Sequence, residues 1–395
     1  MERRDFLKNS ALASSLFFVP NFVRAFEGFD AKSIGYKRLV IIQLSGGNDG
    51  LNTIIPYNND LYYNARPTLA IKKDVIKLND DLALHPSLKP LQSLYDNGEL
   101  SIINNVGYPN PVRSHFRSMD IWQSGSSSDE YLQSGWIGRF LDKHGKQPYN
   151  AIEFDETLSL ALKGKHFNGI ATNDYQTLYK TARDPYFQKV LNHYNDQHLS
   201  EHNLGYLYKN MIDAKSSAKY IYEKTKVKLS QEEYPQNTFA TQLKNTARFI
   251  NSGLKTKVFY NALDGFDTHA NQQNPQKRLL SVYAEALSAF IKDLKRNGTF
   301  EDTLILTFSE FGRRVKQNAA NGTDHGSANN VFVIGKNLKT AGIYNNLSSL
   351  SDLDDNGDLK FTIDFRQVYA TIIENWLGTS TEGIISLPQE KLNVI

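Results

Sequence analysis

The sequence feature that most constrains the fold is an unbroken, mostly apolar run, residues 36–44, that leads into the paired glycines Gly46 and Gly47. A strand with one face in water alternates apolar and polar residues, whereas a strand covered on both faces is apolar almost throughout. Glycines after such a run are typical of the tight turn that leaves a buried strand. The run therefore predicts a central strand of a sheet with helices on both faces.

Similar runs recur along the chain, and segments with a helical repeat separate them. In the clearest such segment, residues 275–296, apolar residues recur at spacings of three and four, and Asn297 and Gly298 supply a stop. Strand and helix therefore alternate, which predicts a three-layer α/β/α sandwich with a largely parallel central sheet. Further strands are expected at 100–106, 257–263, 303–308 and 331–334, and shorter helices at 87–95 and 365–377.

Residues 168–237 differ in composition from the rest of the chain, since they are rich in Tyr, Asn, Lys and Gln and contain few β-branched runs. We interpret them as a helical insertion or cap on a domain that spans residues 36–395. The segment holds His193, His198 and His202. Their spacing among polar neighbours favours an exposed helix face over a metal site.

Composition excludes several classes of protein. A chain of 395 residues with 40% hydrophobic and 22% charged residues can bury a large core, so a folded protein is expected. The net charge is only +3, and the Lys and Arg are interspersed with acidic residues, which gives no basis for a nucleic-acid partner. The sequence contains no cysteine. Any metal ion must therefore be bound by carboxylate and imidazole groups.

The N-terminus resembles a twin-arginine export signal. Arg3 and Arg4 stand shortly before Phe-Leu-Lys, and a mostly apolar stretch of small residues follows over residues 11–23. This stretch is shorter than the ~20 residues of a membrane span and contains Pro20, so no transmembrane span is expected. We predict a leader over residues 1–25 and a periplasmic or exported location. Cleavage after Ala25 and retention as an anchor both remain open.

Polar motifs follow the predicted strands. The first, residues 46–52, places Asp49 among glycines. A carboxylate in such a turn can approach a metal ion closely because few side chains crowd it. The alternative is a simple Asn-Asp-Gly turn with no ligand.

The second motif, residues 113–117, follows the strand expected at 100–106. Ser114 stands where a helix would begin, so an anion could rest on free backbone amides with Arg113 and Arg117 beside it. The Ser114 hydroxyl is a candidate nucleophile, and His115 is its immediate neighbour. In the alternative interpretation Ser114 only caps the helix and the arginines pair with acidic residues.

The third motif follows the strand expected at 257–263. Asp267 and His269 are two residues apart, so in an extended segment they project to one side and can bind one ion together. Asp264 is an alternative or additional ligand. A surface turn without a ligand is the other possibility.

The fourth motif combines Glu310, directly after the strand expected at 303–308, with Asp324 and His325, which precede the strand expected at 331–334. Taken alone, Glu310 would be expected to pair with Arg313 or Arg314, and His325 to be buried and hydrogen-bonded. Carboxylates and imidazoles, however, accompany four separate predicted strands. A parallel sheet would gather them along one edge.

These motifs together resemble an exported bacterial family catalogued as domain of unknown function 1501. The family is in turn similar to the alkaline phosphatase and sulfatase superfamily, which implies an α/β/α sandwich, usually with two divalent ions at the carboxyl edge of the sheet. The resemblance is carried by residues 46–52, 113–117, 267–269, 309–314 and 323–326 and extends to 364–366 and 376–378.

The resemblance implies a role for each motif. The candidate catalytic residues are Ser114, His115, Arg113, Arg117 and Arg313, and the candidate metal ligands are Asp49, Asp267, His269, Glu310 and His325, with Asp264 as an alternative. Two departures stand out. The superfamily usually has Asp followed by His where this chain has Glu310 and Phe311, and its Asp-to-His spacing in the third motif is wider, which Asp264 fits better than Asp267.

The expected function is therefore an exported metal-dependent hydrolase of phosphate or sulfate esters. One or two divalent ions, zinc, manganese or calcium, would act with a Ser114 nucleophile or a metal-bound water. The expected partner is a small anionic ester or a surface glycan. The alternative is a non-catalytic exported binding or assembly protein that keeps the scaffold and one structural metal, and the missing imidazole after Glu310 favours it.

Overall fold

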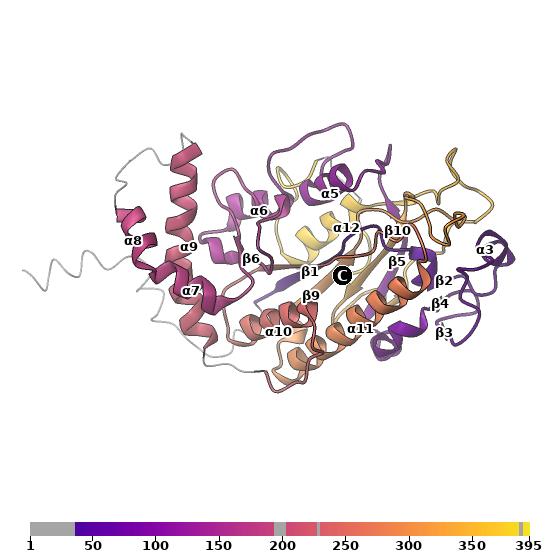
Figure 1. Ribbon diagram of the computed structural model, residues 1–395, viewed down its shortest axis with the longest axis horizontal. Helices are drawn as coiled ribbons and strands as arrows, with labels where there is room; N and C mark the ends of the chain where they lie inside the picture. Colours follow the sequence, from indigo (N-terminus) through magenta and orange to yellow (C-terminus); the bar gives the residue numbers. More distant parts are fainter. Residues whose placement is uncertain (1–35, 193–202, 227–229, 387–389) are drawn as a thin grey trace, which may run out of the picture. The chain divides into compact units, whose positions relative to one another are not determined.

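A nine-stranded sheet runs through the described part of the chain, which the computed structural model gives as residues 36–192, 203–226, 230–386 and 390–395 (Figure 1). The strand order is β11-β5-β10-β9-β1-β8-β6-β7, and β12 also pairs with β5. β10 is antiparallel to both of its neighbours, and every other pairing is parallel. The strands are β1 (Arg38–Leu44), β5 (Leu100–Gly107), β6 (Ala151–Glu153), β7 (Ile170–Ala171), β8 (Val258–Leu263), β9 (Thr303–Phe308), β10 (Asn329–Ile334), β11 (Gly342–Ile343) and β12 (Ile363–Asp364).

The expected fold class is confirmed, and all five strands expected from apolar runs are present within two residues of their predicted bounds. β1 lies between β8 and β9, and all seven of its residues are buried. Its continuous apolar run is explained by helices on both faces of the sheet. A small separate sheet contains β2 (Ile54–Ile55), β4 (Ala83–Leu84) and β3 (Ile76–Lys77), in that order.

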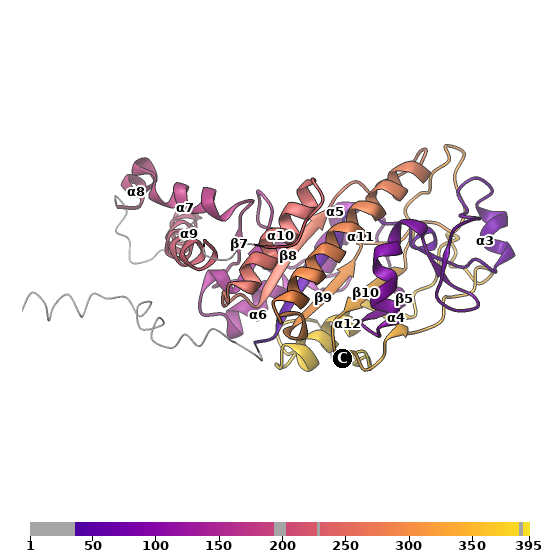
Figure 2. The same ribbon diagram turned by 90° about the horizontal axis from the view of Figure 1, so that it is seen from below.

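Helices cover both faces of the large sheet (Figures 1 and 2). On one face, Leu39 and Ile41 of β1 share a hydrophobic core with Trp122 and Trp136, and the Trp122 ring stacks on Phe308 at a centroid distance of 4.7 Å. The helices on that face are α5 (His115–Ser124), α6 (Trp136–His144) and α12 (Phe365–Thr371), and those on the other are α4 (Gln92–Asp96), α10 (Thr238–Asn251) and α11 (Gln273–Arg296).

Two of the three expected helices depart from the regular α-helix. The segment expected as a helix at 87–95 begins as the 3₁₀-helix Pro86–Leu91, which contains Pro90, because a proline interrupts the α-helical hydrogen bonds. The helix expected at 365–377 continues beyond α12 as a π-helix, Ile372–Trp376. The remaining short 3₁₀-helices are Gly50–Asn52, Pro148–Asn150, Leu160–Leu162 and Phe300–Asp302.

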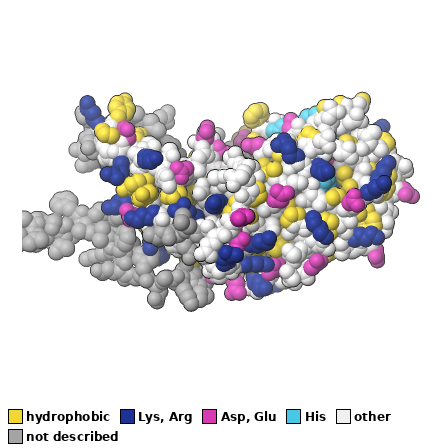
Figure 3. Space-filling model, turned by 60° about the horizontal axis from the view of Figure 1, so that its bottom comes forward, with side chains coloured by type: hydrophobic (Ala, Val, Ile, Leu, Met, Phe, Trp, Pro, Cys, Tyr) yellow, Lys and Arg dark blue, Asp and Glu magenta, His cyan; other side chains and the backbone are white. Residues whose placement is uncertain are grey.

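Between β7 and α10 the described residues are mainly helical, in the segment where we expect an insertion. His193, His198 and His202 lie outside the described residues, as does the predicted leader. No helix among the residues that are described is long and apolar enough to cross a membrane. On the face drawn in Figure 3, positive and negative side chains are intermixed. The other helices are α3 (Asp60–Ala65), α7 (Tyr175–Arg183), α8 (Pro185–Asn192) and α9 (Asn203–Thr225).

Glu153, at the end of β6, is a buried carboxyl group within this fold. Burial raises its pKa to about 7, although the backbone N–H of Ser159 donates a hydrogen bond of 2.7 Å to Glu153 Oε2. Between pH 4.5, its ordinary pKa, and about 7, the folded protein holds a proton that the unfolded chain has lost. The free energy of unfolding therefore falls as the pH rises through this window.

Replacing Glu153 by Gln should remove this penalty. The difference in unfolding free energy between Glu153→Gln and the wild type should be roughly 2–3 kcal/mol more in favour of the variant at pH 8 than at pH 5. Urea unfolding at the two pH values measures the difference, and Glu285→Gln, at an exposed position of α11, is the matched control. The same stability difference at both pH values would contradict a raised pKa.

Candidate metal centre

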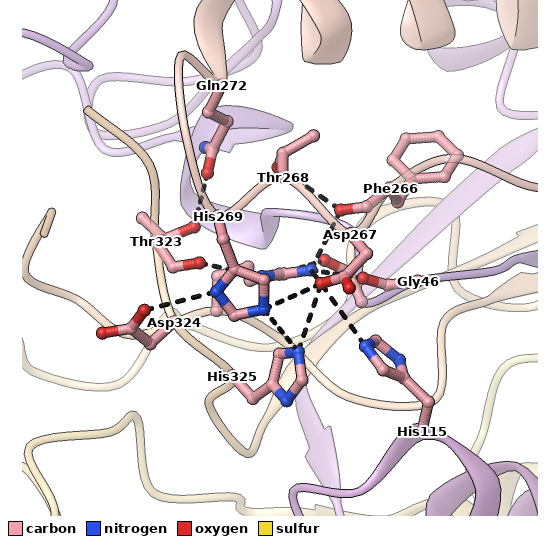
Figure 4. Close-up of polar contacts among 12 residues, drawn as sticks. Gly46, His115, Phe266, Asp267, Thr268, His269, Gln272, Thr323, Asp324 and His325 are labelled. Carbon is pink, nitrogen blue, oxygen red and sulfur yellow. Dashed lines mark hydrogen bonds and ion pairs between the residues drawn. The ribbon is translucent and has the colours of Figure 1, made fainter. Parts of the chain in front are cut away.

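Polar loops from five adjacent strands meet at one edge of the sheet. The loops that follow β5, β9, β1 and β8 leave at the carboxyl edge, as parallel strands require. Because β10 is antiparallel, the loop that enters it lies at this same edge. This orientation explains how His325, which precedes a strand, meets Asp267 and His269, which follow one (Figure 4).

Three imidazole rings converge on one carboxylate oxygen, Oδ1 of Asp267. The Nε2 atoms of His269, His325 and His115 lie 3.0, 3.2 and 3.4 Å from this oxygen (Figure 4). The Nε2 atoms of His269 and His325 are 2.9 Å apart. The centre is partly open, since the Asp267 side chain is 47% exposed and that of His269 is 45% exposed.

Hydrogen bonds on the far side of two of these rings fix their orientation. Nδ1 of His115 lies 2.9 Å from Oε1 of Glu310, and Nδ1 of His325 lies 2.7 Å from the carbonyl oxygen of Arg113. Carboxylate and carbonyl oxygens accept hydrogen bonds, so in both rings Nδ1 is assigned as the donor. In the neutral ring, Nε2 then carries a lone pair that points into the cluster.

His269 repeats this arrangement on the exposed side. Its Nδ1 lies 3.3 Å from Oδ1 of Asp324. The Asn318 amide, which donates to the same oxygen, and His269 hold the pKa of Asp324 below its ordinary value. In all three rings an oxygen therefore holds Nδ1, and Nε2 is left for the cluster.

The residues present fit a bound divalent ion. Ligand atoms of His115, Asp267 and His325 all lie within 4.8 Å of one another. Within the described part of the chain, the buried Nε2 atom of His115 has no hydrogen-bond partner. Lone pairs that face one another without a proton between them repel, and a cation would relieve this repulsion. Imidazole with carboxylate is a donor set that suits zinc or manganese.

Arg313 binds the Asp267 carboxylate of this cluster from the protein interior. Its Nη2 atom donates to Oδ1 of Asp267 at 2.7 Å, and the guanidinium also donates to the carbonyl oxygens of Gly46, Gly47, Phe266 and Thr323. Burial raises the pKa of Asp267, but the hydrogen bond from the Arg313 guanidinium and its positive charge outweigh this effect and leave the pKa well below its ordinary value. The Arg313 side chain has no exposed surface, so it positions Asp267 and does not face solvent.

Glu310 stands behind His115 and is not part of the three-residue ligand group. Its fully buried carboxylate accepts hydrogen bonds from the backbone N–H of Gly46 at 2.7 Å and from His115. Ser309 Oγ lies 3.3 Å from its other oxygen. The hydrogen bond with Glu310 raises the pKa of His115, against the effect of burial. In this structure Glu310 thus orients a candidate ligand.

Asp49 is in a different environment. Its carboxylate, which has no exposed surface, accepts a hydrogen bond of 2.6 Å from Nη1 of the equally buried Arg66. Gln272 Nε2 donates to the same oxygen. Arg66 also donates to the carbonyl oxygen of Val315 at 2.8 Å. The structure therefore places Asp49 in a buried ion pair, outside the three-residue ligand group.

The other predicted residues, Asp264, Ser114, Arg113 and Arg117, are outside the three-residue ligand group. Asp264 is exposed and does not belong to the three-residue ligand group. Ser114 is an exposed residue at the N-cap of α5, and its side chain makes no capping hydrogen bond within the described structure. Arg113 Nε donates to the buried Asp358 carboxylate at 2.9 Å. Arg117 Nη2 donates to the carbonyl oxygens of Ser128 and Glu130 at 3.1 and 2.6 Å.

Some contributors were given no role by sequence reasoning. Asp324 was named in the fourth motif beside His325 but was not assigned to the site. Arg66 and Gln272 carry no motif, and only their contacts identify them. Phe311 is buried, with its ring centroid 4.9 Å from that of His115 and 4.7 Å from that of His325. It therefore forms an apolar wall of the centre.

The Asp49–Arg66 pair generates a prediction about stability. Asp49→Ala would leave the buried Arg66 charge without a counter-charge, which costs about 3–5 kcal/mol of unfolding free energy. Asp264→Ala, at an exposed position on a neighbouring loop, should change stability by less than about 0.5 kcal/mol. Urea unfolding measures both values. An Asp49→Ala protein as stable as the wild type would show that the ion pair does not support the fold.

A family model and several solved structures match most of the chain, whereas no curated protein matches the sequence. The solved structures that resemble this one include the lipoteichoic acid synthase LtaP from Listeria monocytogenes, with 12% identity over 94% of this chain and 81% of the other and a TM-score of 0.40. Another is the C-terminal periplasmic domain of EcEptC from Escherichia coli, with 13% identity, 90% and 86% coverage and a TM-score of 0.39.

A third similar structure is the PsFucS1 sulfatase from Pseudoalteromonas sp., with 12% identity over 90% of this chain and 70% of the other and a TM-score of 0.38. The family model described as "Protein of unknown function (DUF1501)" matches residues 36–384. This match includes the motifs at β1, β5, β8 and β9 and the loop before β10. The chain belongs to the DUF1501 family.

Proposed function

We propose that this centre binds one divalent ion, zinc or manganese, and hydrolyses phosphate or sulfate esters. The observation that carries the proposal is the convergence of three Nε2 atoms on Oδ1 of Asp267, with an oxygen holding the Nδ1 atom of each ring. The ligands would be His115, Asp267 and His325, with His269 completing a four-ligand set or leaving that position to substrate. Calcium prefers oxygen ligands, so a centre with three imidazoles disfavours it.

One ion per chain is proposed because, among the described residues, the only group of three or more candidate ligands is His115, Asp267 and His325. Arg66 neutralises Asp49 inside the protein. Glu310 is occupied by the Gly46 amide and by His115.

In this proposal a bound ion would act as a Lewis acid, which would polarise the ester and make an attacking hydroxyl group a better nucleophile. Ser114 is exposed and adjacent to His115, so its hydroxyl is one candidate nucleophile, and a water molecule is the other. The first backbone amides of α5 provide partial positive charge for an anionic ester. Arg113, Arg117 and Arg313 act as positioning residues, because protein groups already engage their guanidiniums.

Export belongs to the proposal as well. It rests on Arg3, Arg4 and the apolar stretch that follows, all of which precede the described residues. An exported enzyme of this kind would meet small anionic esters or ester groups on a surface glycan. The twin-arginine route would deliver it to the periplasm or beyond.

The ligand assignment predicts the metal content of variants. Asp267→Ala and His325→Ala should each reduce metal content from about one ion per chain to a small fraction, and both should abolish ester hydrolysis. His144→Ala is the control, because His144 bonds to Thr379 away from the centre. Elemental analysis and assays with aryl phosphates and sulfates measure the two effects. Unchanged metal content and turnover in both ligand variants would refute the assignment.

The role of Glu310 is tested separately. Glu310→Gln should retain the fold but lower metal affinity by roughly 10- to 100-fold, because an amide orients and polarises His115 less well than a carboxylate. Competition with a chromogenic chelator gives the dissociation constants. Glu285→Gln, in an exposed part of α11, should bind the metal as the wild type does. Equal affinities for Glu310→Gln and the wild type would show that Glu310 has no such role.

The second candidate function is a non-catalytic binding protein with one structural metal. Phe311 favours it, because a buried phenyl ring stands where the resemblance would place another imidazole. A preparation that contains metal but hydrolyses no aryl phosphate or sulfate, over a range of pH and added ions, would support this second function over the first.

A further inference from the structure

We infer that Phe116 and Tyr131 form an aromatic rim beside the metal centre that stacks on a ring of the substrate, so that the preferred substrates are esters of ring-bearing alcohols. This inference rests on the proposed function and names the substrate class for the same site. The first observation is exposure. The Phe116 side chain is 83% exposed and that of Tyr131 is 73% exposed, whereas aromatic residues are usually well covered in folded proteins.

The second observation is the position of Phe116 on α5. It directly follows His115, whose ring points to Asp267. Successive side chains leave a helix about 100° apart, so Phe116 projects from the side of α5 adjacent to the one that carries the imidazole. A phenyl ring at this position projects into solvent one residue from a candidate metal ligand. At the upper edge of the face in Figure 3, histidine side chains reach the surface with hydrophobic side chains beside them.

The third observation is that Tyr131 is held in place. The guanidinium of Arg117 lies over its ring, 3.7 Å from the centroid. The same guanidinium bonds to the carbonyl oxygens of Ser128 and Glu130, so the loop that carries Tyr131 is tied to the first turn of α5. A fixed aromatic side chain loses little conformational entropy when a ligand stacks on it.

The chemistry of the rim indicates its occupant. The centre provides charged and polar groups for the anionic part of an ester, and the rim provides apolar ring faces for the alcohol part. Flat rings stack on the apolar face of a sugar or on an aryl group. A second protein copy is a poorer candidate, because a stable interface buries about 800 Å² per partner and needs more than two exposed aromatics.

Kinetics with matched esters test this inference on the metal-loaded protein. The probes are 4-nitrophenyl phosphate and glucose 6-phosphate, which bear rings, and methyl phosphate, which does not, together with 4-nitrophenyl sulfate and methyl sulfate. We expect Phe116→Ala to raise KM for the ring-bearing esters roughly 3- to 10-fold, with kcat and the values for the methyl esters unchanged. Phe116→Tyr should keep the wild-type values. The aryl and sugar probes distinguish the two kinds of ring.

The control variant is Tyr186→Ala, which removes an equally exposed aromatic residue (77%) from α8. It should change no constant. Metal content and calorimetric binding of the phosphate probes are measured in parallel. A wild-type protein that lacks metal or turns over no ester contradicts the proposed function, and calorimetry then tests the rim alone. Equal effects of Phe116→Ala on ring-bearing and methyl esters, or no effect on either in kinetics and binding, overturn the aromatic rim.

Discussion

The candidate centre depends on one buried guanidinium, that of Arg313. A charge without exposed surface is tolerated only when it is paired and its donors are satisfied. Arg313 meets this requirement by bonding to Asp267 and to carbonyl oxygens on three separate loops, which follow β1, follow β8 and precede β10. The loops that form the centre are therefore fixed to one another through a single side chain. Gly46 permits this close approach, since its φ is +113° and a Cβ there would lie 2.5 Å from the Asp267 backbone nitrogen.

The same network separates structural charges from those available to a ligand. Asp49 and Arg66 neutralise each other in the interior, and Glu310 is engaged by a backbone amide and by His115. The carboxylates of Asp267 and Asp324 remain about half exposed. The chemistry proposed for this edge of the sheet is therefore concentrated in a small, partly open cluster that is supported by a rigid polar interior.

The fold could be predicted in large part because its signals are local. Periodicity within a segment of six to twenty residues reports burial on two faces or on one, and the runs that became β1, β5, β8, β9 and β10 carry this signal. Their connection into a layered sheet follows from alternation with helices. The lengths of the helices were less certain, since Pro90 and the π-helical turn after α12 depend on local details that periodicity does not report.

By itself, the sequence determined the strands, the edge at which the polar motifs gather, and the presence of Asp267, His269 and His325 among the candidate ligands. Only the tertiary structure decided which carboxylates face these rings and which face arginines. The physical reason is distance along the chain, because the Gly46 amide and the Glu310 carboxylate that bond to each other are 264 positions apart. No local pattern records whether a carboxylate at a strand end will meet a guanidinium or an imidazole.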